Sequence, residues 1–305
     1  MSNAANDNGS QHTAVLVEET MHVLDVKAGG RYLDGTLGGG THSMELLKRS
    51  SPDGRVVSLD VDRSALERAK AQFASYGDRW QGVETNFRFL DTAARDAGVE
   101  PLDGILLDLG FSSDELADPT KGLSFLVNGP LDMRLGPKAN EDGLTAADIV
   151  NSWPVGDIER VLREYGEERF SRRIAEEIVR ARKSSRIIGT LDFVAVIKKA
   201  LPATYERGRI HPATRSFQAL RIAVNDELNT LQKAIKAAHE VLSPGGRLAI
   251  ITFHSLEDRI VKNAFKSEDG WEPVVKKPIL PQEDEIENNP RSRSAKLRAA
   301  KKGVA

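Results

Sequence analysis

The sequence predicts an α/β fold in which a doubly wound parallel sheet is interrupted by a helical insert. Three observations lead to this prediction. Short apolar runs alternate with helical stretches over residues 31–109, only loop and helix patterns follow over 112–201, and the alternation resumes over 214–253. Alternation of strands and helices is typical of βαβ units, whose parallel sheet has helices on both faces.

The first part of this pattern contains four strands. We expect strands at residues 31–34, 55–60, 82–85 and 104–109, and helices at 41–48 and 63–76. The second and fourth runs, Arg-Val-Val-Ser-Leu-Asp and Gly-Ile-Leu-Leu-Asp-Leu, are apolar enough for strands that are covered on both faces.

The alternation stops after the fourth strand. Glycine and proline interrupt residues 112–143, and residues 144–201 have only helical patterns. One long helix is expected at 214–242, because its apolar residues recur every three or four positions, and a fifth strand at 247–253. We therefore expect a disordered N-terminus (1–11), a discontinuous α/β domain (12–115 and 208–305) and an insert for substrate recognition (116–207).

Composition excludes several classes of protein. The chain has 305 residues, 40% hydrophobic and 29% charged, which is ordinary for a globular protein. The absence of cysteine excludes disulfides, thiolate zinc sites and iron–sulfur clusters, and the scattered histidines predict no metal site. No apolar run is long enough to span a membrane, and no signal peptide is recognisable, so a cytoplasmic location is expected.

Basic residues are gathered in two places although the net charge is only −2. One is an expected helix of the insert and the other is the end of the chain. We expect both to contact RNA phosphates, although a solvated surface is an equally good interpretation of charge alone. The candidate RNA-binding residues are Arg172, Arg173, Arg180, Lys183, Arg291, Arg293 and Arg298.

A glycine-rich turn, Asp34-Gly-Thr-Leu-Gly-Gly-Gly-Thr-His-Ser43, follows the first strand. It lacks the lysine of an NTPase phosphate loop, where Thr41 stands, and the last glycine of the dinucleotide fingerprint. A cofactor without a pyrophosphate, S-adenosylmethionine, fits better. We expect Gly38 and its neighbours to lie against it, Asp34 to hold its ammonium group and Asp60 its ribose hydroxyls. The alternative is that Asp34 and Asp60 only cap helices.

The ends of the fourth and fifth strands are expected to face the substrate, because ligands bind outside the carboxyl ends of such strands. These strand ends suit a flat substrate such as a nucleobase turned out of its stack. Asp108 is the candidate acceptor of a proton from its amine, and Ser112 would orient the nucleobase. His254 is a second candidate for the proton acceptor. Asp108 could instead contact only the cofactor, and His254 could be structural. The segment 255–258 resembles the start of a helix.

Eight segments in order resemble the MraW family, the bacterial 16S rRNA (cytosine-N4) methyltransferases of the small ribosomal subunit. Besides the glycine-rich turn, they are His12-Thr-Ala-Val-Leu16, Gly104-Ile-Leu-Leu-Asp-Leu-Gly-Phe-Ser-Ser113, Gly129-Pro-Leu-Asp-Met-Arg134, Tyr165-Gly-Glu-Glu-Arg-Phe170, His211-Pro-Ala-Thr-Arg-Ser-Phe-Gln218, Thr252-Phe-His-Ser-Leu-Glu-Asp-Arg259 and Asn289-Pro-Arg-Ser-Arg-Ser-Ala-Lys-Leu-Arg298.

The resemblance implies a Rossmann-like class I S-adenosylmethionine-dependent methyltransferase with a helical insert. It implies N4-methylation of cytidine 1402 in the decoding centre of 16S rRNA, with the small ribosomal subunit as partner. The cofactor residues it implies are Gly40, Thr41, His42, Asp60, Phe87, Asp108 and Glu115. Two departures from methyltransferases in general are Thr36 at the first glycine of the turn, and Asp108-Leu-Gly-Phe111 in place of an acid-Pro-Pro-aromatic motif.

Two other functions remain open at this stage. One is a methyltransferase of the same fold that acts on another RNA, a protein or a small molecule. The other is a non-catalytic ribosome-binding module, which a test of S-adenosylmethionine binding would separate from the enzymes. The sequence leaves the oligomeric state open, a homodimer included.

Overall fold

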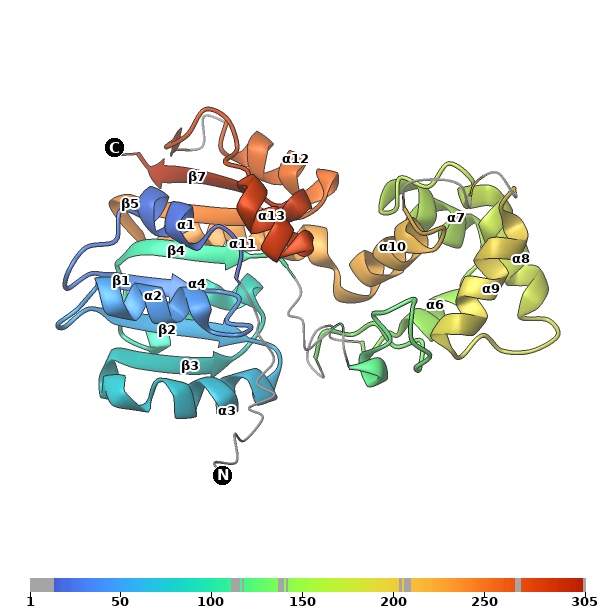
Figure 1. The fold of residues 1–305 in the computed structure, drawn as a ribbon, viewed down its shortest axis with the longest axis horizontal. Helices are drawn as coiled ribbons and strands as arrows, with labels where there is room; N and C mark the ends of the chain where they lie inside the picture. The colour runs from blue at the N-terminus through green and yellow to red at the C-terminus, as the bar shows by residue number, and fades with distance from the viewer. Residues whose placement is uncertain are drawn as a thin grey trace, which may run out of the picture.

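The protein has two lobes, a sheet with helices on both faces and a bundle of helices beyond the carboxyl ends of its parallel strands (Figure 1). This computed structural model describes residues 14–110, 116, 118–136, 140, 142–202, 205, 210–266 and 270–303. The expected disordered stretch 1–11 lies outside these residues. None of the described helices is long and apolar enough to cross a membrane.

The described residues form one seven-stranded sheet of order β3-β2-β1-β4-β5-β7-β6. The strands β1 to β5 are parallel, and β7 is antiparallel to both β5 and β6. This order with one reversed strand is the fold of class I S-adenosylmethionine-dependent methyltransferases. The strands are β1 (Arg31–Asp34), β2 (Arg55–Asp60), β3 (Trp80–Glu84), β4 (Leu102–Asp108), β5 (Leu242–Thr252), β6 (Trp271–Pro273) and β7 (Lys296–Lys302).

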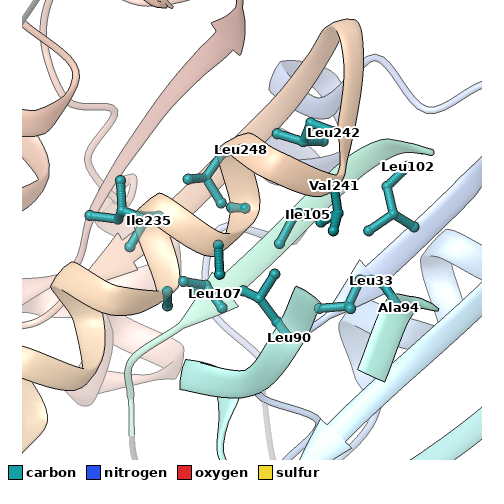
Figure 2. Close-up of a cluster of buried hydrophobic side chains, with 14 of the residues drawn as sticks. Leu33, Leu90, Ala94, Leu102, Ile105, Leu107, Ile235, Val241, Leu242 and Leu248 are labelled. Carbon is teal, nitrogen blue, oxygen red and sulfur yellow. The ribbon is translucent and has the colours of Figure 1, made fainter. Parts of the chain in front are cut away.

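Alternate residues of the central strands enter two cores, one on each face of the sheet. Leu33 and Leu107 pack with Leu90, Ile235 and other side chains of α4 and α11 (Figure 2). Their strand neighbours, such as Tyr32 and Leu106, pack on the opposite face with α1, α2 and α3. The helices on these faces are α1 (Val17–Leu24), α2 (Thr41–Arg49), α3 (Arg63–Gln72), α4 (Leu90–Asp96), α11 (Glu227–Val241) and α12 (Ser255–Ala264), and α13 (Glu283–Asn288) follows near the end of the chain. A period of two within a buried strand thus supplies both layers.

The insert has its own hydrophobic core. It is built by α6 (Ala146–Ser152), α7 (Val155–Glu164), α8 (Ser171–Ala181), α9 (Thr190–Ala200) and α10 (Thr214–Asn225), together with the loop before α6. Phe217 and Leu220 of α10 are buried in this core, although we expected the α/β domain to resume at residue 208. The described packing therefore carries the insert to the end of α10, and the division into domains remains a proposal.

The single helix predicted at 214–242 is wrong. Asp226 adopts a left-handed conformation (φ 49°) and separates α10 from α11. The apolar period continues across the break, which is why the pattern concealed it. The Ser-Pro-Gly-Gly segment at 243–246 lies within the bounds of β5. The basic end of the chain is not a free tail, because residues 296–302 are strand β7.

Candidate functional site

A pocket opens at the carboxyl ends of β1, β2, β4 and β5. The sheet order reverses between β1 and β4, and this switch point is where open α/β sheets bind ligands. Its walls come from residues far apart in the sequence. They include residues 35–42, Asp60, Phe87, Asp108 and Phe253 from the sheet lobe, and Leu135 and Asn225 from the insert.

The glycine-rich turn lies too close to neighbouring side chains to carry side chains of its own at two positions. A Cβ atom on Gly35 would lie 2.4 Å from a methyl group of Leu107, and one on Gly40 would lie 2.9 Å from the Phe73 ring. Gly40 also has a positive φ of 79° at the start of α2. Thr36, which departs from the common glycine pattern, accepts a hydrogen bond from the backbone N–H of Asp108 (2.7 Å) through its hydroxyl. The turn is therefore bonded directly to the end of β4.

Asp34 does not face the pocket, which corrects its expected role at the cofactor. Its side chain is fully buried and accepts hydrogen bonds from the Ser43 hydroxyl (2.6 Å) and the Thr36 backbone N–H (3.1 Å). Burial raises the pKa of Asp34, and the hydrogen bonds from Ser43 and Thr36 act against this. The carboxyl group holds the turn in shape from beneath.

Asp60 lies where a ribose would be held. Its two carboxylate oxygens accept hydrogen bonds from the backbone N–H groups of Gly38 (3.0 Å) and Asp62 (2.8 Å), and the side chain lines the pocket. These bonds fix the orientation of the carboxylate at the pocket wall. Phe87, in the turn after β3, supplies an aromatic wall nearby.

The structure brings most predicted cofactor residues to this one pocket. Gly38, Gly40, Thr41, His42, Asp60, Phe87 and Asp108 all line it. Ser112 and Glu115 lie outside the described residues, so their roles stay predictions. We propose the seven residues that line the pocket as the cofactor site.

Asp108 ends β4 in the middle of the pocket. Its side chain is 15% exposed, 3.5 Å from the His42 imidazole Nε2, and accepts a hydrogen bond from the Gly110 backbone N–H (3.2 Å). The pKa of Asp108 is raised to about 6, mainly by burial; His42 and the Gly110 hydrogen bond act against this rise, and the charges of Asp34 and Glu257 add to it. A carboxylate with this pKa can accept a proton near neutral pH.

His254 begins α12, so the helix start expected at 255–258 is confirmed, with His254 as the cap. Its Nδ1 accepts a hydrogen bond from the Glu257 backbone N–H (3.4 Å), and Glu257 accepts hydrogen bonds from the backbone N–H groups of Phe253 and His254. This capping box gives His254 a structural role. Its direct catalytic role stays a prediction.

Sequence reasoning missed two acidic residues of the pocket, Glu227 and Glu257. Glu227 begins α11 and binds Arg221 through both oxygens (2.7 and 2.9 Å). Glu227, His254 and Glu257 have ligand atoms within 4.8 Å of one another. The prediction of no metal site therefore remains to be tested at this group. Asn225 and Asp226 both have low helix propensity, and this was the sign in the sequence that one helix ends and another begins beside Glu227.

The predicted RNA-binding residues lie in different environments. Arg172 and Arg180 are 77% and 70% exposed on α8, each beside a glutamate, and α8 lies on the side of the insert away from the sheet (Figure 1). The Arg173 guanidinium lies 5.8 Å from the centre of the Phe170 ring, and Lys183 is exposed beyond the end of α8. Arg291 and Arg293 are exposed in the turn before β7, and Arg291 lines the pocket.

The structure corrects the RNA-binding role expected for Arg298. Its guanidinium is 13% exposed in β7, and its Nε donates to Asp258 Oδ1 (2.7 Å). An arginine held in a half-buried pair has few donors left for a phosphate. Arg298 is therefore a structural link between β7 and α12.

Comparisons with known proteins agree with this geometry. The sequence profile of the MraW methylase family matches residues 9–303. "Ribosomal RNA small subunit methyltransferase H" from Carboxydothermus hydrogenoformans is 47% identical over 309 residues, covering 95% of this chain and 97% of the relative. The protein of the same name from Symbiobacterium thermophilum is 47% identical over 312 residues, covering 95% and 96%. With its sheet order, its glycine-rich turn and this match along nearly the whole sequence, the chain belongs to the MraW methylase family.

Proposed function

We propose that this protein transfers a methyl group from S-adenosylmethionine to the N4 amine of a cytidine in 16S rRNA, cytidine 1402 of the decoding centre. The observation that carries the proposal is the position of Asp108. It stands between a wall that suits the cofactor, with Asp60 and Phe87, and a wall that offers Phe253 and Glu257. The names of the two relatives support ribosomal RNA as the substrate class.

The residues present fit the cofactor. Asp60 is held by two backbone N–H groups at the wall of the pocket, and a carboxylate there is the group that would accept hydrogen bonds from ribose hydroxyls. The close approach of Gly35 and Gly40 to their neighbours leaves the turn without side chains, so a ligand can lie against its backbone. S-adenosylmethionine supplies an electrophilic methyl group on a sulfonium, and its sulfur is the leaving group, as a neutral thioether.

Asp108 would supply the base that the amine needs. The lone pair of an exocyclic amine is delocalised into the ring, and a carboxylate that accepts a hydrogen bond from its N–H makes the nitrogen a better nucleophile. Asp108 would take the proton that the amine nitrogen loses when it is methylated. Its pKa of about 6 allows Asp108 to pass the proton on to water at neutral pH.

The substrate side is formed by Phe253 and by the glutamates 227 and 257. An aromatic ring beside acceptors suits a flat base that has been turned out of its stack. Ser112 and His254 are proposed to orient this base, and the insert is proposed to hold the surrounding RNA. A cytoplasmic location belongs to the same proposal.

The test is mass spectrometry of rRNA nucleosides after incubation with labelled S-adenosylmethionine. Small subunits and free 16S rRNA from a strain that lacks this enzyme would be compared. Label in N4-methylcytidine at position 1402 is the expected result. Label in another nucleoside would change the substrate, and binding of the cofactor without any label in RNA would favour an enzyme that acts on another molecule. Absence of cofactor binding would favour the ribosome-binding module.

A further inference from the structure

We propose that Lys121 of the insert is a positioning residue for the cofactor site, which it reaches through Asp62 and Asp60. This inference rests on the proposed function and goes beyond it, because it makes the substrate-binding insert a part of cofactor binding. Lys121 ends a short 3-10 turn, η3 (Pro119–Lys121), in the loop-rich first part of the insert. Asp62 directly precedes α3 in the sheet lobe.

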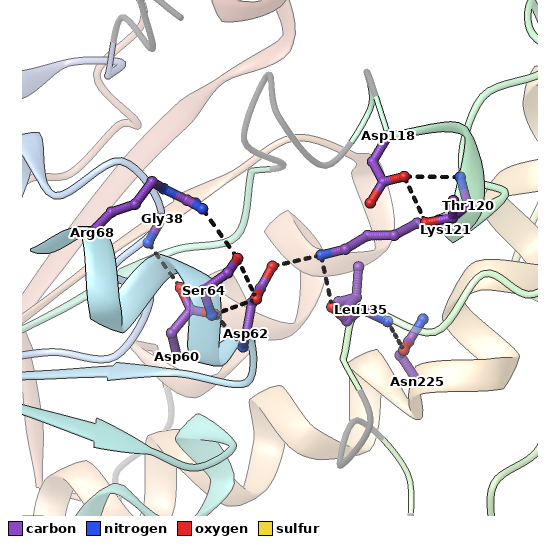
Figure 3. A network of polar contacts seen from close by, with 10 residues as sticks. All are labelled: Gly38, Asp60, Asp62, Ser64, Arg68, Asp118, Thr120, Lys121, Leu135 and Asn225. Atoms are coloured by element: carbon purple, nitrogen blue, oxygen red, sulfur yellow. Dashed lines mark hydrogen bonds and ion pairs between the residues drawn. The ribbon is translucent and has the colours of Figure 1, made fainter. Parts of the chain in front are cut away.

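A continuous series of polar contacts joins the two lobes (Figure 3). The Lys121 ammonium donates to Asp62 Oδ2 (2.9 Å) and to the Leu135 carbonyl (3.2 Å). The backbone N–H of Asp62 in turn donates to Asp60 Oδ1 (2.8 Å). The carboxylate expected to hold the ribose is thus separated from the insert by a single residue.

The two oxygens of Asp62 have different partners. Oδ1 caps α3 by accepting from the backbone N–H (2.9 Å) and the hydroxyl (2.7 Å) of Ser64, and Oδ2 accepts from Lys121. The side chains of Lys121 and Asp62 are only 18% and 24% exposed, so their ion pair is less screened than a surface pair. The ion pair can therefore be removed while the helix cap is kept.

The insert segment beside Lys121 also closes the pocket. Leu135 lines it, and a Cβ atom on the next residue, Gly136, would lie 2.5 Å from the carbonyl oxygen of Val61. The Leu135 backbone N–H donates to Asn225 Oδ1 (3.0 Å), and the Asn225 amide nitrogen donates to the carbonyls of Met133 (2.9 Å) and Arg221 (2.9 Å). The end of α10 thus fixes the segment that Lys121 ties to Asp62.

This arrangement couples two binding events. When the insert is docked, Lys121 holds Asp62, and Asp62 holds the ribose-binding carboxylate. Any ligand that favours the docked insert should then also favour cofactor binding, and the two ligands should tighten each other's binding by the same factor, because such coupling is reciprocal. RNA bound to the insert should tighten cofactor binding, and cofactor should tighten RNA binding.

The experiment is calorimetric titration of the full-length protein with S-adenosylhomocysteine, the product form of the cofactor, with and without an RNA fragment of the decoding centre. The variants are Lys121→Met, Asp62→Asn, which retains an oxygen for the α3 cap, and the double variant. Lys301→Met is the control for the loss of a paired lysine, because Lys301 forms an ion pair of similar length with Glu272 (2.8 Å) in a more exposed position at the far edge of the sheet. Lys121→Arg tests rescue by a retained charge.

We expect Lys121→Met to weaken S-adenosylhomocysteine binding about three- to tenfold and to remove most of the tightening caused by RNA. Asp62→Asn should have a similar effect, the double variant should be no weaker than the single ones, and Lys121→Arg should recover most of the affinity. Lys301→Met should bind like wild type. Unchanged affinity and RNA response in both single variants would overturn the inference, as would additive losses in the double variant. If wild-type protein does not bind S-adenosylhomocysteine, the proposed function itself fails.

Discussion

The two walls of the pocket are built in different ways. On the cofactor wall, Asp60 is held by hydrogen bonds from the backbone N–H groups of Gly38 and Asp62, and the buried Asp34 holds the glycine-rich turn from behind through Thr36 and Ser43. On the opposite wall, burial raises the pKa of Asp108 to about 6, and the nearby charge of Glu257 acts in the same direction. The first wall is prepared to recognise a fixed ligand, whereas the second contains Asp108, a carboxyl group whose protonation can change during a reaction.

The largest effect that separates the walls is expected for Asp108→Asn. The amide keeps the shape of the side chain but cannot take a proton from the amine, so turnover should fall by about two orders of magnitude or more. Affinity for S-adenosylmethionine should fall only about threefold or less, because the amide oxygen still accepts a hydrogen bond. Steady-state methylation and calorimetry on the same preparation would measure both. Equal losses of turnover and affinity would place Asp108 on the cofactor wall.

Asp60→Ala should show the opposite behaviour. Loss of charge-assisted hydrogen bonds to the ribose should weaken cofactor binding at least about tenfold, with turnover at saturating cofactor much less affected. The backbone N–H groups of Gly38 and Asp62 would also lose their acceptor, so the melting temperature should fall in the alanine variant and less in Asp60→Asn. Wild-type affinity in Asp60→Ala would remove this carboxylate from the cofactor site.

A third prediction concerns RNA binding by the insert. Reversing the charges of Arg172, Arg173 and Arg180 should weaken binding of the small subunit several-fold and reduce its dependence on salt concentration. Arg298→Ala should leave RNA affinity unchanged but lower the free energy of unfolding by about 1–3 kcal/mol, because Asp258 would lose its half-buried partner. Binding of the small subunit over a range of salt concentrations, together with urea unfolding, tests both. Undiminished binding by the reversed variant would make α8 a solvated surface.

The smallest effect is a gain in stability. The pKa of Asp108 is raised to about 6 from 3.8, so the folded protein without cofactor binds this proton more tightly than the unfolded chain does. That contribution to stability is complete below the ordinary pKa and is lost as the pH rises through about 6. The amide side chain cannot ionise, so Asp108→Asn should be about 1–3 kcal/mol more stable than wild type above that pH, with a smaller advantage towards pH ~4. Urea unfolding at both pH values measures this, and a destabilised variant at neutral pH would contradict the raised pKa.

Local sequence pattern was sufficient to place the glycine-rich turn and Asp60 at the pocket. Both follow directly after strands, so a strand assignment such as 55–60 already brings Asp60 there. Local pattern could not distinguish Asp34 from Asp60, because both residues end strands. Only the packing of Ser43 over Asp34 shows that Asp34 is covered. The resemblance to a family supplied residues such as Phe87, which a pattern of strands and helices does not distinguish from ordinary core.

The substrate wall and the insert depend on contacts between distant segments. Glu227 reaches the pocket because the chain breaks at Asp226, which an uninterrupted apolar period conceals. Lys121 meets Asp62 across 59 positions of the sequence, and nothing local marks either residue as a partner. Arg298 stands in a basic run but faces Asp258, because antiparallel pairing with β5 places β7 beside α12. Charge alone therefore predicted an exposed arginine that contacts RNA, whereas the fold places Arg298 in an ion pair with Asp258.

The most direct test of the account is single-turnover methylation of small subunits at saturating cofactor and RNA, measured between about pH 5 and pH 8 for wild type and Asp108→Asn. Methylation requires the Asp108 carboxylate, so the wild-type rate should rise with pH and level off above an apparent pKa at or below about 6, since a bound cationic cofactor lowers the pKa of a neighbouring acid. The amide variant should be slower by about two orders of magnitude at the plateau and should lack the rise. A variant that methylates at the wild-type rate throughout this range would contradict the assignment of Asp108 as the proton acceptor.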